Sequence, residues 1–100
     1  MVIDFGQALV AVSGEILMEA DDTPALLRVA CVNALVTELE SDRNTTGEQK
    51  LARWLLAKRI YEADGPLDLT AEEVALIKDR AGQGFGAAVV GPIYQALEGK

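Results

Sequence analysis

Histidine is absent from this chain of 100 residues, and cysteine occurs once, as Cys31. Without histidine, the Cys–His pair that activates a nucleophilic thiol cannot form. A single thiol also excludes an internal disulfide, which fits a reducing compartment such as the cytoplasm. Because Cys31 stands among small apolar residues, we interpret it as a buried side chain of the core.

Long hydrophobic runs are also absent. A membrane-spanning helix needs about 20 apolar residues, and no segment approaches that length. The first twelve residues contain no Lys or Arg, and Asp4 and Gly6 interrupt them, so we do not read a signal peptide there. We therefore expect a cytoplasmic protein that has no membrane partner.

Motifs for catalysis, cofactors and metals are weak. The glycine-rich segment 82–86 is followed by Ala87, where a dinucleotide-binding fingerprint needs its third glycine, and a charged helix precedes it instead of a strand. The carboxylate pairs at 21–22 and 72–73 stand at expected helix starts, where acids have a structural reason to be. Neither pair extends into a calcium-binding loop. We expect no enzymatic activity, no cofactor and no metal ion.

Acidic residues, by contrast, are numerous and unevenly distributed. Half of the residues are hydrophobic, as in globular proteins, and the length fits a single domain over residues 1–100. The net charge is −7, and residues 1–42 carry all of this excess, because acids and bases are equal in number over residues 43–100. The first segment has one base, Arg28, and its acids are Asp4, Glu15, Glu19, Asp21, Asp22, Glu38, Glu40 and Asp42.

The segregation of the acids favours a docking role over a role in solubility alone. An acidic surface repels nucleic acid and anionic membranes, but it attracts basic protein surfaces and speeds encounters with them. The expected partner is a protein or ribonucleoprotein with a basic surface, without direct nucleic-acid binding. The candidate partner-binding residues are Glu15, Glu19, Asp21, Asp22, Glu38, Glu40 and Asp42.

The first forty residues predict a small hairpin followed by an apolar helix. The Ser-Gly pair at 13–14 is a turn signal between two β-prone runs, although a short helix over residues 6–20 competes with the hairpin. Thr23 as N-cap and Pro24 at the first helical position predict a helix over residues 24–39. This helix is apolar nearly all round, which is typical of the central element of a bundle.

Three more helices are predicted after it. Thr46 and Thr70 each begin a capping box, and the helices that follow extend to about Ala63 and Ala81. The glycines after Ala81 predict a flexible joint before a last helix over residues 87–98. The expected core side chains of the second and third helices are Leu51, Leu55, Leu56, Ile60, Val74 and Ile77. The resulting fold class is mainly α, with about four helices packed around the central apolar helix and a possible small N-terminal β-hairpin.

Two aromatic residues of the second helix allow two interpretations. Trp54 and Tyr61 lie on one side of the helix with Lys58 between them. Trp and Tyr are enriched in the energetically important parts of protein interfaces. They are also large core side chains, and core packing is the favoured interpretation.

The order of several short segments resembles a known group of proteins. The segments are Ile3-Asp4-Phe5, Val32-Asn33-Ala34-Leu35, Gly47-Glu48-Gln49-Lys50, Ile60-Tyr61, Leu69-Thr70-Ala71-Glu72-Glu73, Val90-Gly91 and Leu97-Glu98. Together they resemble small proteins of tailed-phage and prophage genomes, over nearly the full length of the chain. The resemblance carries over no functional residue.

The resemblance implies a protein that acts inside a bacterial host cell. Small acidic phage proteins without a catalytic apparatus include anti-CRISPR proteins, other inhibitors of host machinery, and assembly factors of the tail or head. An anti-CRISPR protein would suit the charge, because CRISPR surveillance complexes hold nucleic acid in a positively charged channel. We therefore expect a phage-encoded inhibitor that binds a host nucleic-acid-binding complex. The alternative is a structural or assembly protein of the phage particle.

Overall fold

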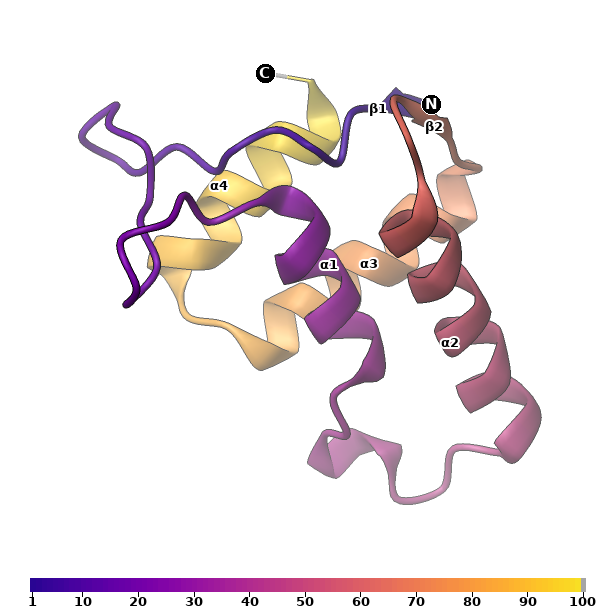
Figure 1. Cartoon of the computed structure of the whole chain (residues 1–100). Helices are drawn as coiled ribbons and strands as arrows, with labels where there is room; N and C mark the ends of the chain where they lie inside the picture. Colours follow the sequence, from indigo (N-terminus) through magenta and orange to yellow (C-terminus); the bar gives the residue numbers. More distant parts are fainter. Residues whose placement is uncertain (100) are drawn as a thin grey trace.

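Four α-helices carry the fold. The computed structural model describes residues 1–99, in the order β1 (Val2–Ile3), α1 (Leu27–Val36), the 3₁₀-helix η1 (Glu40–Asp42), α2 (Gly47–Glu62), β2 (Leu67–Asp68), α3 (Ala71–Gly84) and α4 (Ala87–Glu98). Helix α1 packs against α2, α3 and α4 and occupies the centre of the molecule (Figure 1). The mainly α fold with a central apolar helix is therefore confirmed.

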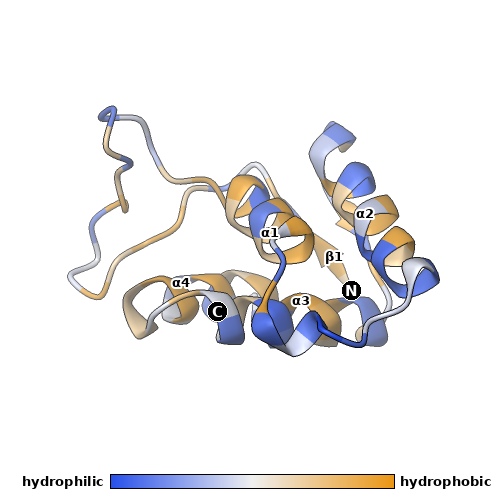
Figure 2. Cartoon of the chain, turned by 90° about the horizontal axis from the view of Figure 1, so that it is seen from below, coloured by the Kyte–Doolittle hydropathy of each residue, from blue (hydrophilic) through white to orange (hydrophobic). Residues whose placement is uncertain are grey.

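The core lies where the other helices face α1. In Figure 2, α1 and α4 are hydrophobic along much of their length, while hydrophilic turns recur along α2. Burying one aliphatic side chain contributes about 1.5–3 kcal/mol, so a contiguous cluster of this kind holds a small domain together. The largest fully buried side chains are Phe5, Leu9, Leu27, Leu35, Ile60, Ile77, Ile93 and Leu97.

Both predicted capping boxes begin helices. The Thr46 hydroxyl accepts a hydrogen bond from the Gln49 backbone N–H at 3.2 Å, and the Gln49 side chain accepts one from the Thr46 N–H at 3.0 Å. Thr70 and Glu73 exchange the equivalent bonds at 3.1 and 2.9 Å. These bonds satisfy N–H groups that the first turn of a helix leaves without partners, so they place the starts of α2 and α3.

Two predicted helix boundaries are wrong. α1 begins at Leu27 instead of residue 24, because Pro24 forms a β-bridge with Met18 and Leu26 forms one with Ala8. At the other end, Thr37 is already extended, so the helix stops at Val36 instead of residue 39. Thr23 therefore does not cap this helix, and the 21–22 acid pair does not lie at its start.

The glycines near residue 82 do not break α3. The helix continues through Gly82 to Gly84, past the predicted joint. A Cβ on Gly82 would lie 3.1 Å from the hydroxyl of Tyr94, which donates a 2.7 Å hydrogen bond to the carbonyl of Lys78. The missing side chain thus lets α4 approach α3 closely, which explains a glycine inside a helix.

Residues 8–26, called the arm below, form an extended segment held by backbone bonds. Three strand-like stretches meet in a closed ring: Leu17 N–H donates to Leu9 C=O, Ala25 N–H to Leu17 C=O, and Leu9 N–H to Ala25 C=O, each at 2.8 Å. The predicted turn is present at one tip, where Ala11 N–H donates to Glu15 C=O at 2.8 Å. Gly14 has φ +90° there, a conformation that glycine adopts without strain.

The regular sheet lies elsewhere. Among residues 1–99 it consists of β1 and β2, paired antiparallel with Val2 opposite Asp68 and Ile3 opposite Leu67. The ammonium group of Met1 donates to the carbonyl of Leu69 at 2.8 Å. This pairing fixes the start of the chain beside the α2–α3 connection, next to the core.

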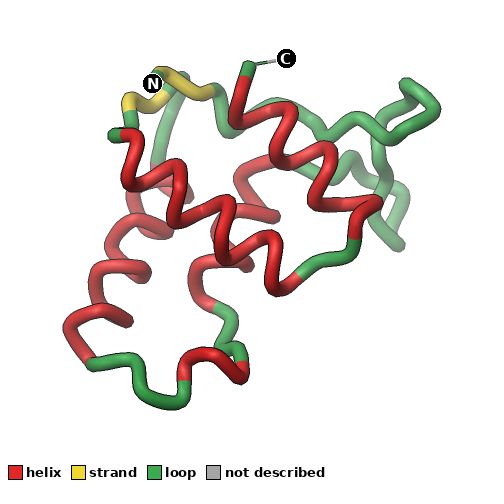
Figure 3. Tube along the Cα trace, turned by 180° about the vertical axis from the view of Figure 1, so that it is seen from behind, coloured by secondary structure: helices red, strands yellow, loops and turns green. Residues whose placement is uncertain are grey.

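The arm and α2 lie at opposite ends of the molecule. The molecule measures 39 × 28 × 24 Å, and the arm projects from the side away from α2 in Figures 1, 2 and 3. Within residues 1–99 no helix combines the length and the apolar character that crossing a bilayer requires.

Candidate protein-interaction surfaces

The arm turns four apolar side chains outward. Successive residues of an extended chain point to opposite faces, so buried Leu9 and half-buried Leu17 alternate with exposed neighbours. The exposed side chains are Val10, Val12, Ile16 and Met18, with exposed fractions of 46, 109, 52 and 50%. Val12 stands at the tip and is fully exposed. Apolar side chains gathered on a projecting segment are typical of a surface that another molecule covers.

The acids of the arm surround these apolar side chains. Glu15, Glu19, Asp21 and Asp22 are exposed, and residues 8–26 contain no Lys or Arg. Within the described chain none of the four forms an ion pair; Asp21 instead accepts a 2.6 Å hydrogen bond from the hydroxyl of Thr23. That bond lowers the pKa of the Asp21 carboxyl. The arm is therefore negatively charged and locally unneutralised.

Arg28, the first base after the arm, does not neutralise it. Its guanidinium donates to the carbonyls of Ile60 and Ala63 at 3.2 and 2.7 Å. Ile60 lies in the last turn of α2 and Ala63 directly follows the helix, where carbonyl groups lack helical partners. Arg28 thus joins α1 to the end of α2.

The other three candidate acids do not lie on the arm. Glu38 follows α1 and pairs with Lys50 of α2 at 3.0 Å, and Glu40 is exposed in η1. The seven candidate acids therefore form two groups, with the arm at one side of the molecule and the α1–η1 segment at its lower end in Figure 1. The seven candidate acids therefore do not form one continuous face.

Asp42 is buried and belongs to the interior. Arg80 of α3 binds its carboxylate in a bidentate manner, with Nη1–Oδ1 at 2.7 Å and Nη2–Oδ2 at 2.8 Å. Arg53 of α2 adds a third charged bond at 2.9 Å, and the Leu39 N–H donates to Oδ2 at 2.8 Å. Asp42 is 4% exposed, so it is not available as a docking residue.

The Asp42 cluster joins three parts of the fold. Besides Asp42, the Arg80 guanidinium binds the carbonyls of Ala34 and Thr37, at 3.4 and 2.8 Å, and so closes the C-terminal end of α1. The side-chain bonds from Arg80, the Leu39 N–H and the Arg53 side chain together hold the pKa of Asp42 well below its ordinary range. The cluster is a structural element that fixes α2 and α3 around α1.

A second exposed apolar surface lies on α2. It consists of Leu51, Trp54, Leu55 and Tyr61, with exposed fractions of 54, 52, 47 and 70%. Their spacing places them on one side of the helix, away from the buried residues Leu56, Ala57 and Ile60. Core packing of Trp54, Tyr61, Leu51 and Leu55 is therefore a wrong prediction, because α2 is apolar on two faces and only one faces the core.

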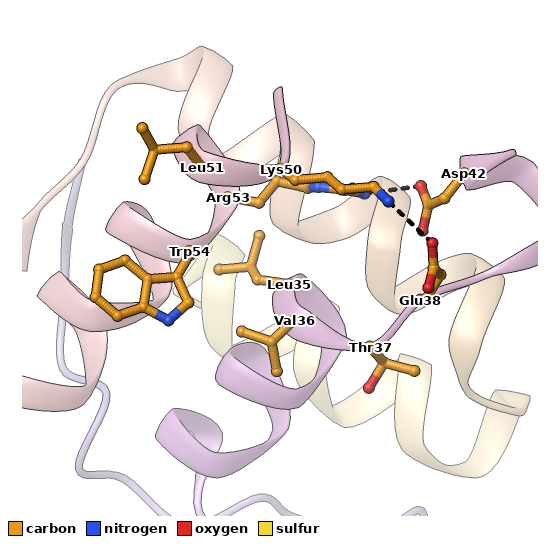
Figure 4. A pocket seen from close by; sticks show the side chains of 9 residues that line it. All are labelled: Leu35, Val36, Thr37, Glu38, Asp42, Lys50, Leu51, Arg53 and Trp54. Carbon is orange, nitrogen blue, oxygen red and sulfur yellow. Dashed lines mark hydrogen bonds and ion pairs between the residues drawn. The ribbon is translucent and has the colours of Figure 1, made fainter. Parts of the chain in front are cut away.

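Two adjoining pockets border this α2 face. The first, of about 340 Å³, lies between the end of α1 and the start of α2 (Figure 4). The second, of about 200 Å³, continues toward Tyr61, and Val36 and Trp54 line both. In Figure 4, Lys50 and Arg53 reach from α2 toward the acids Glu38 and Asp42. The pockets form a groove with apolar walls and basic residues along its α2 side.

Lys58 is the cation in this groove that forms no ion pair among residues 1–99. Its ammonium group lies 5.6 Å from the centre of the Trp54 ring, within the range of a cation–π contact. Lys50 is half exposed, and its pair with Glu38 is exposed as well, so that contact exchanges readily with water. An acidic ligand group therefore has two accessible ammonium groups beside an apolar floor.

Comparison with protein-family models, with curated proteins and with solved structures finds no match to this chain. Within the described residues, no group of three or more His, Cys, Asp or Glu side chains could hold a metal ion. Cys31 is buried in α1, and burial raises the pKa of its thiol to about 12. The arm and the α2 face are therefore the candidate interaction surfaces.

Proposed function

We propose that this protein acts by docking its arm onto a basic surface of another protein. The observation that supports the proposal most directly is the combination of four exposed apolar side chains with four acids on a segment that contains no base. Apolar contact supplies affinity, while the acids steer the encounter and select a basic partner. Neither feature is required by the fold, because the arm's shape is held by backbone bonds.

The proposed partner is a nucleic-acid-binding complex of a bacterial host, with the CRISPR interference machinery as the specific candidate. Such complexes present basic channels to nucleic acid, and an acidic arm competes for the same charge. The apolar side chains between the acids add contacts that a phosphate backbone lacks. The affinity is therefore expected to fall as the salt concentration rises. The apolar contacts are not screened by salt, so some affinity is expected to remain at high salt.

Two matched variants distinguish an effect of the arm's acids from an effect of the protein's overall net charge. The arm-reversed variant changes Glu15, Glu19, Asp21 and Asp22 to Lys. The control-reversed variant changes Glu48, Glu62, Asp64 and Glu72, which are exposed and lie outside the arm, to Lys. Each substitution adds two charges, so both variants move the net charge from −7 to +1.

The functional test uses a host whose CRISPR system restricts a sensitive phage. Expression of the wild-type chain is expected to restore plaques, and the control-reversed variant is expected to restore them as well. The arm-reversed variant is expected to leave restriction intact. Unchanged restriction in the presence of the wild-type chain would remove the CRISPR machinery as the partner.

A second candidate function is a structural or assembly protein of a phage particle. The α2 face favours it, because an assembly subunit needs interaction surfaces on more than one side and the arm and α2 lie at opposite ends. This function predicts co-purification with tail or capsid proteins from phage-producing cells. Recovery of host proteins alone would count against it.

A further inference from the structure

Helix α2 has the largest excess of bases over acids among the helices, and Lys58 is its one base without an ion pair among residues 1–99. Gly47–Glu62 contains four bases, Lys50, Arg53, Lys58 and Arg59, against the two acids Glu48 and Glu62. The arm contains four acids and no base. Both ends also expose apolar side chains. The two surfaces are therefore complementary in charge and both able to form apolar contacts.

One molecule cannot bring these two surfaces together. The arm and α2 lie on opposite sides of α1, and the ring of backbone bonds fixes the base of the arm on its own side (Figures 1 and 2). Contact between the two surfaces therefore requires two molecules. A contact between two different patches of identical chains is heterologous, so it leaves one free arm and one free α2 face on every open assembly.

We infer that the groove between α1 and α2 receives the arm of a second copy of this chain. Val12 at the tip of one arm enters the apolar pockets between Val36 and Trp54 of the next molecule. Glu15, three residues further along the arm, then meets Lys58, which lies one helical turn beyond Trp54. The tip of the arm thus carries an apolar side chain and an acid, and the groove offers an apolar pocket and a cation.

This inference rests on the proposed function, because it uses the arm as a docking segment. The second copy and the basic partner would bind the same arm and compete for it. Self-association is expected to be weak, because the pockets are small and each copy carries seven negative charges in excess. A partner with a stronger basic surface would displace the second copy.

Trp54 gives a direct spectroscopic readout, because it is the single tryptophan of the chain and lines both pockets. A trace of wild-type protein is titrated with the Trp54→Phe variant, which emits no tryptophan fluorescence but carries an intact arm. Covering the half-exposed indole with an apolar arm is expected to shift its emission to shorter wavelength. A Trp54→Phe titrant that also carries Val12→Ser and Glu15→Lys is expected to need at least about tenfold more protein for the same shift.

Two results would overturn the inference. One is an unchanged emission spectrum up to about 1 mM titrant, the concentration at which even a weak specific contact forms. The other is an equal shift with both titrants, because contact would then not involve the tip of the arm.

A charge-swap mixture tests the pairing without relying on tryptophan. One variant carries Glu15→Lys and Glu19→Lys, and the other carries Lys50→Glu and Lys58→Glu. Each alone is expected to sediment as a monomer, because the charges proposed to meet, at residues 15 and 19 of the arm and at residues 50 and 58 of α2, then have the same sign. Mixed, they are expected to associate, since residues 15 and 19 of each variant can then face residues 50 and 58 of opposite charge in the other. A mixture that remains monomeric while wild-type protein associates would overturn the inference.

The α2 variant also separates this inference from the proposed function. Lys50→Glu with Lys58→Glu leaves the arm intact, so it is expected to lose self-association and to retain protection of a CRISPR-targeted phage. Loss of protection with this variant would mean that α2 itself contacts the host partner, which contradicts the assignment of α2 to a second copy. Absence of protection by the wild-type chain, with self-association intact, would overturn only the host partner.

Discussion

The arm and the helical core contain similar apolar side chains but use them in opposite ways. In residues 27–99, Leu27, Leu35, Ile60, Ile77 and Ile93 are fully buried and hold the helices together. In residues 8–26, Leu9 and Ala25 anchor the segment in the core, but Val10, Val12, Ile16 and Met18 are exposed, and a ring of backbone hydrogen bonds maintains the shape. A segment whose backbone carries its structure is free to present side chains to a partner, whereas the core is not.

Charge separates the two regions in the same way. The one fully enclosed acid, Asp42, is bound by Arg80 and Arg53 and serves the packing of α1, α2 and α3. The four acids of the arm have no basic neighbour in their own segment. The buried acid is thus paired inside the protein, whereas the acids of the arm are exposed and form no ion pair among residues 1–99.

The largest expected difference comes from one substitution made in both regions. Ile60→Ala in the core removes a fully buried side chain and is expected to lower the free energy of unfolding by about 2–5 kcal/mol. Ile16→Ala in the arm, where the side chain is 52% exposed, is expected to change it by less than about 0.5 kcal/mol. Chemical denaturation measures both. Similar losses would show that the arm is part of the core.

Two arginines allow the same comparison for ion pairs. Arg80→Met leaves Asp42 buried with Arg53 alone and is expected to lower the free energy of unfolding by about 3 kcal/mol. Arg59→Met removes the half-exposed pair with Glu73 and is expected to cost at most about 1 kcal/mol. Urea denaturation of the two variants checks the ranking, and a larger loss for Arg59→Met would contradict it.

The pH dependence of stability follows from Asp42. Its folded-state pKa lies below the ordinary value of 3.8, so the folded chain binds fewer protons than the unfolded chain in acid. The resulting stabilisation is present above the ordinary pKa and is lost as the pH falls below it. Melting temperatures measured from neutral to strongly acidic pH are expected to fall steeply in wild type and less steeply in Asp42→Asn. Parallel curves would contradict the role of this carboxyl.

The smallest expected effect concerns the tip of the arm. Gly14→Ala forces an alanine to φ +90° and is expected to cost about 1 kcal/mol, confined to the tip. Gly47→Ala, where φ is not positive and no atom lies within 4 Å of the added Cβ, is expected to be neutral or stabilising. Amide exchange at Ala11 is expected to accelerate only in the Gly14 variant. Loss of global stability in that variant would mean that the tip supports the core.

The parts of the fold that depend on local signals could be predicted from the sequence. Thr46 with Gln49, and Thr70 with Glu73, place the starts of α2 and α3 because a capping box is made within four residues. The predicted start of α1 is wrong because it depends on non-local pairing. Pro24 has the sequence context of a helix start, but a β-bridge to Met18 holds it in an extended conformation. Long-range pairing outweighs a local preference there.

The site shows the same limit. From the sequence, Asp42 is predicted to be an exposed acid like its neighbours. Its burial could not be predicted, because Arg80, its main partner, lies 38 residues away in the chain. Trp54 and Tyr61 read as core side chains, because both faces of α2 are apolar and the sequence does not say which one faces α1. The excess of acids over residues 1–42 is a local signal, but it does not distinguish the exposed acids of the arm from the buried Asp42.

The central claim, that the arm is the docking element, is tested most directly by affinity capture from host lysate with three baits side by side: wild type, the arm-reversed variant and the control-reversed variant. Circular dichroism is expected to show the same helical content for all three. Proteins retained by wild type are expected to be retained by the control-reversed bait and lost from the arm-reversed bait. Equal retention by the two variants, at the same net charge, would contradict the claim.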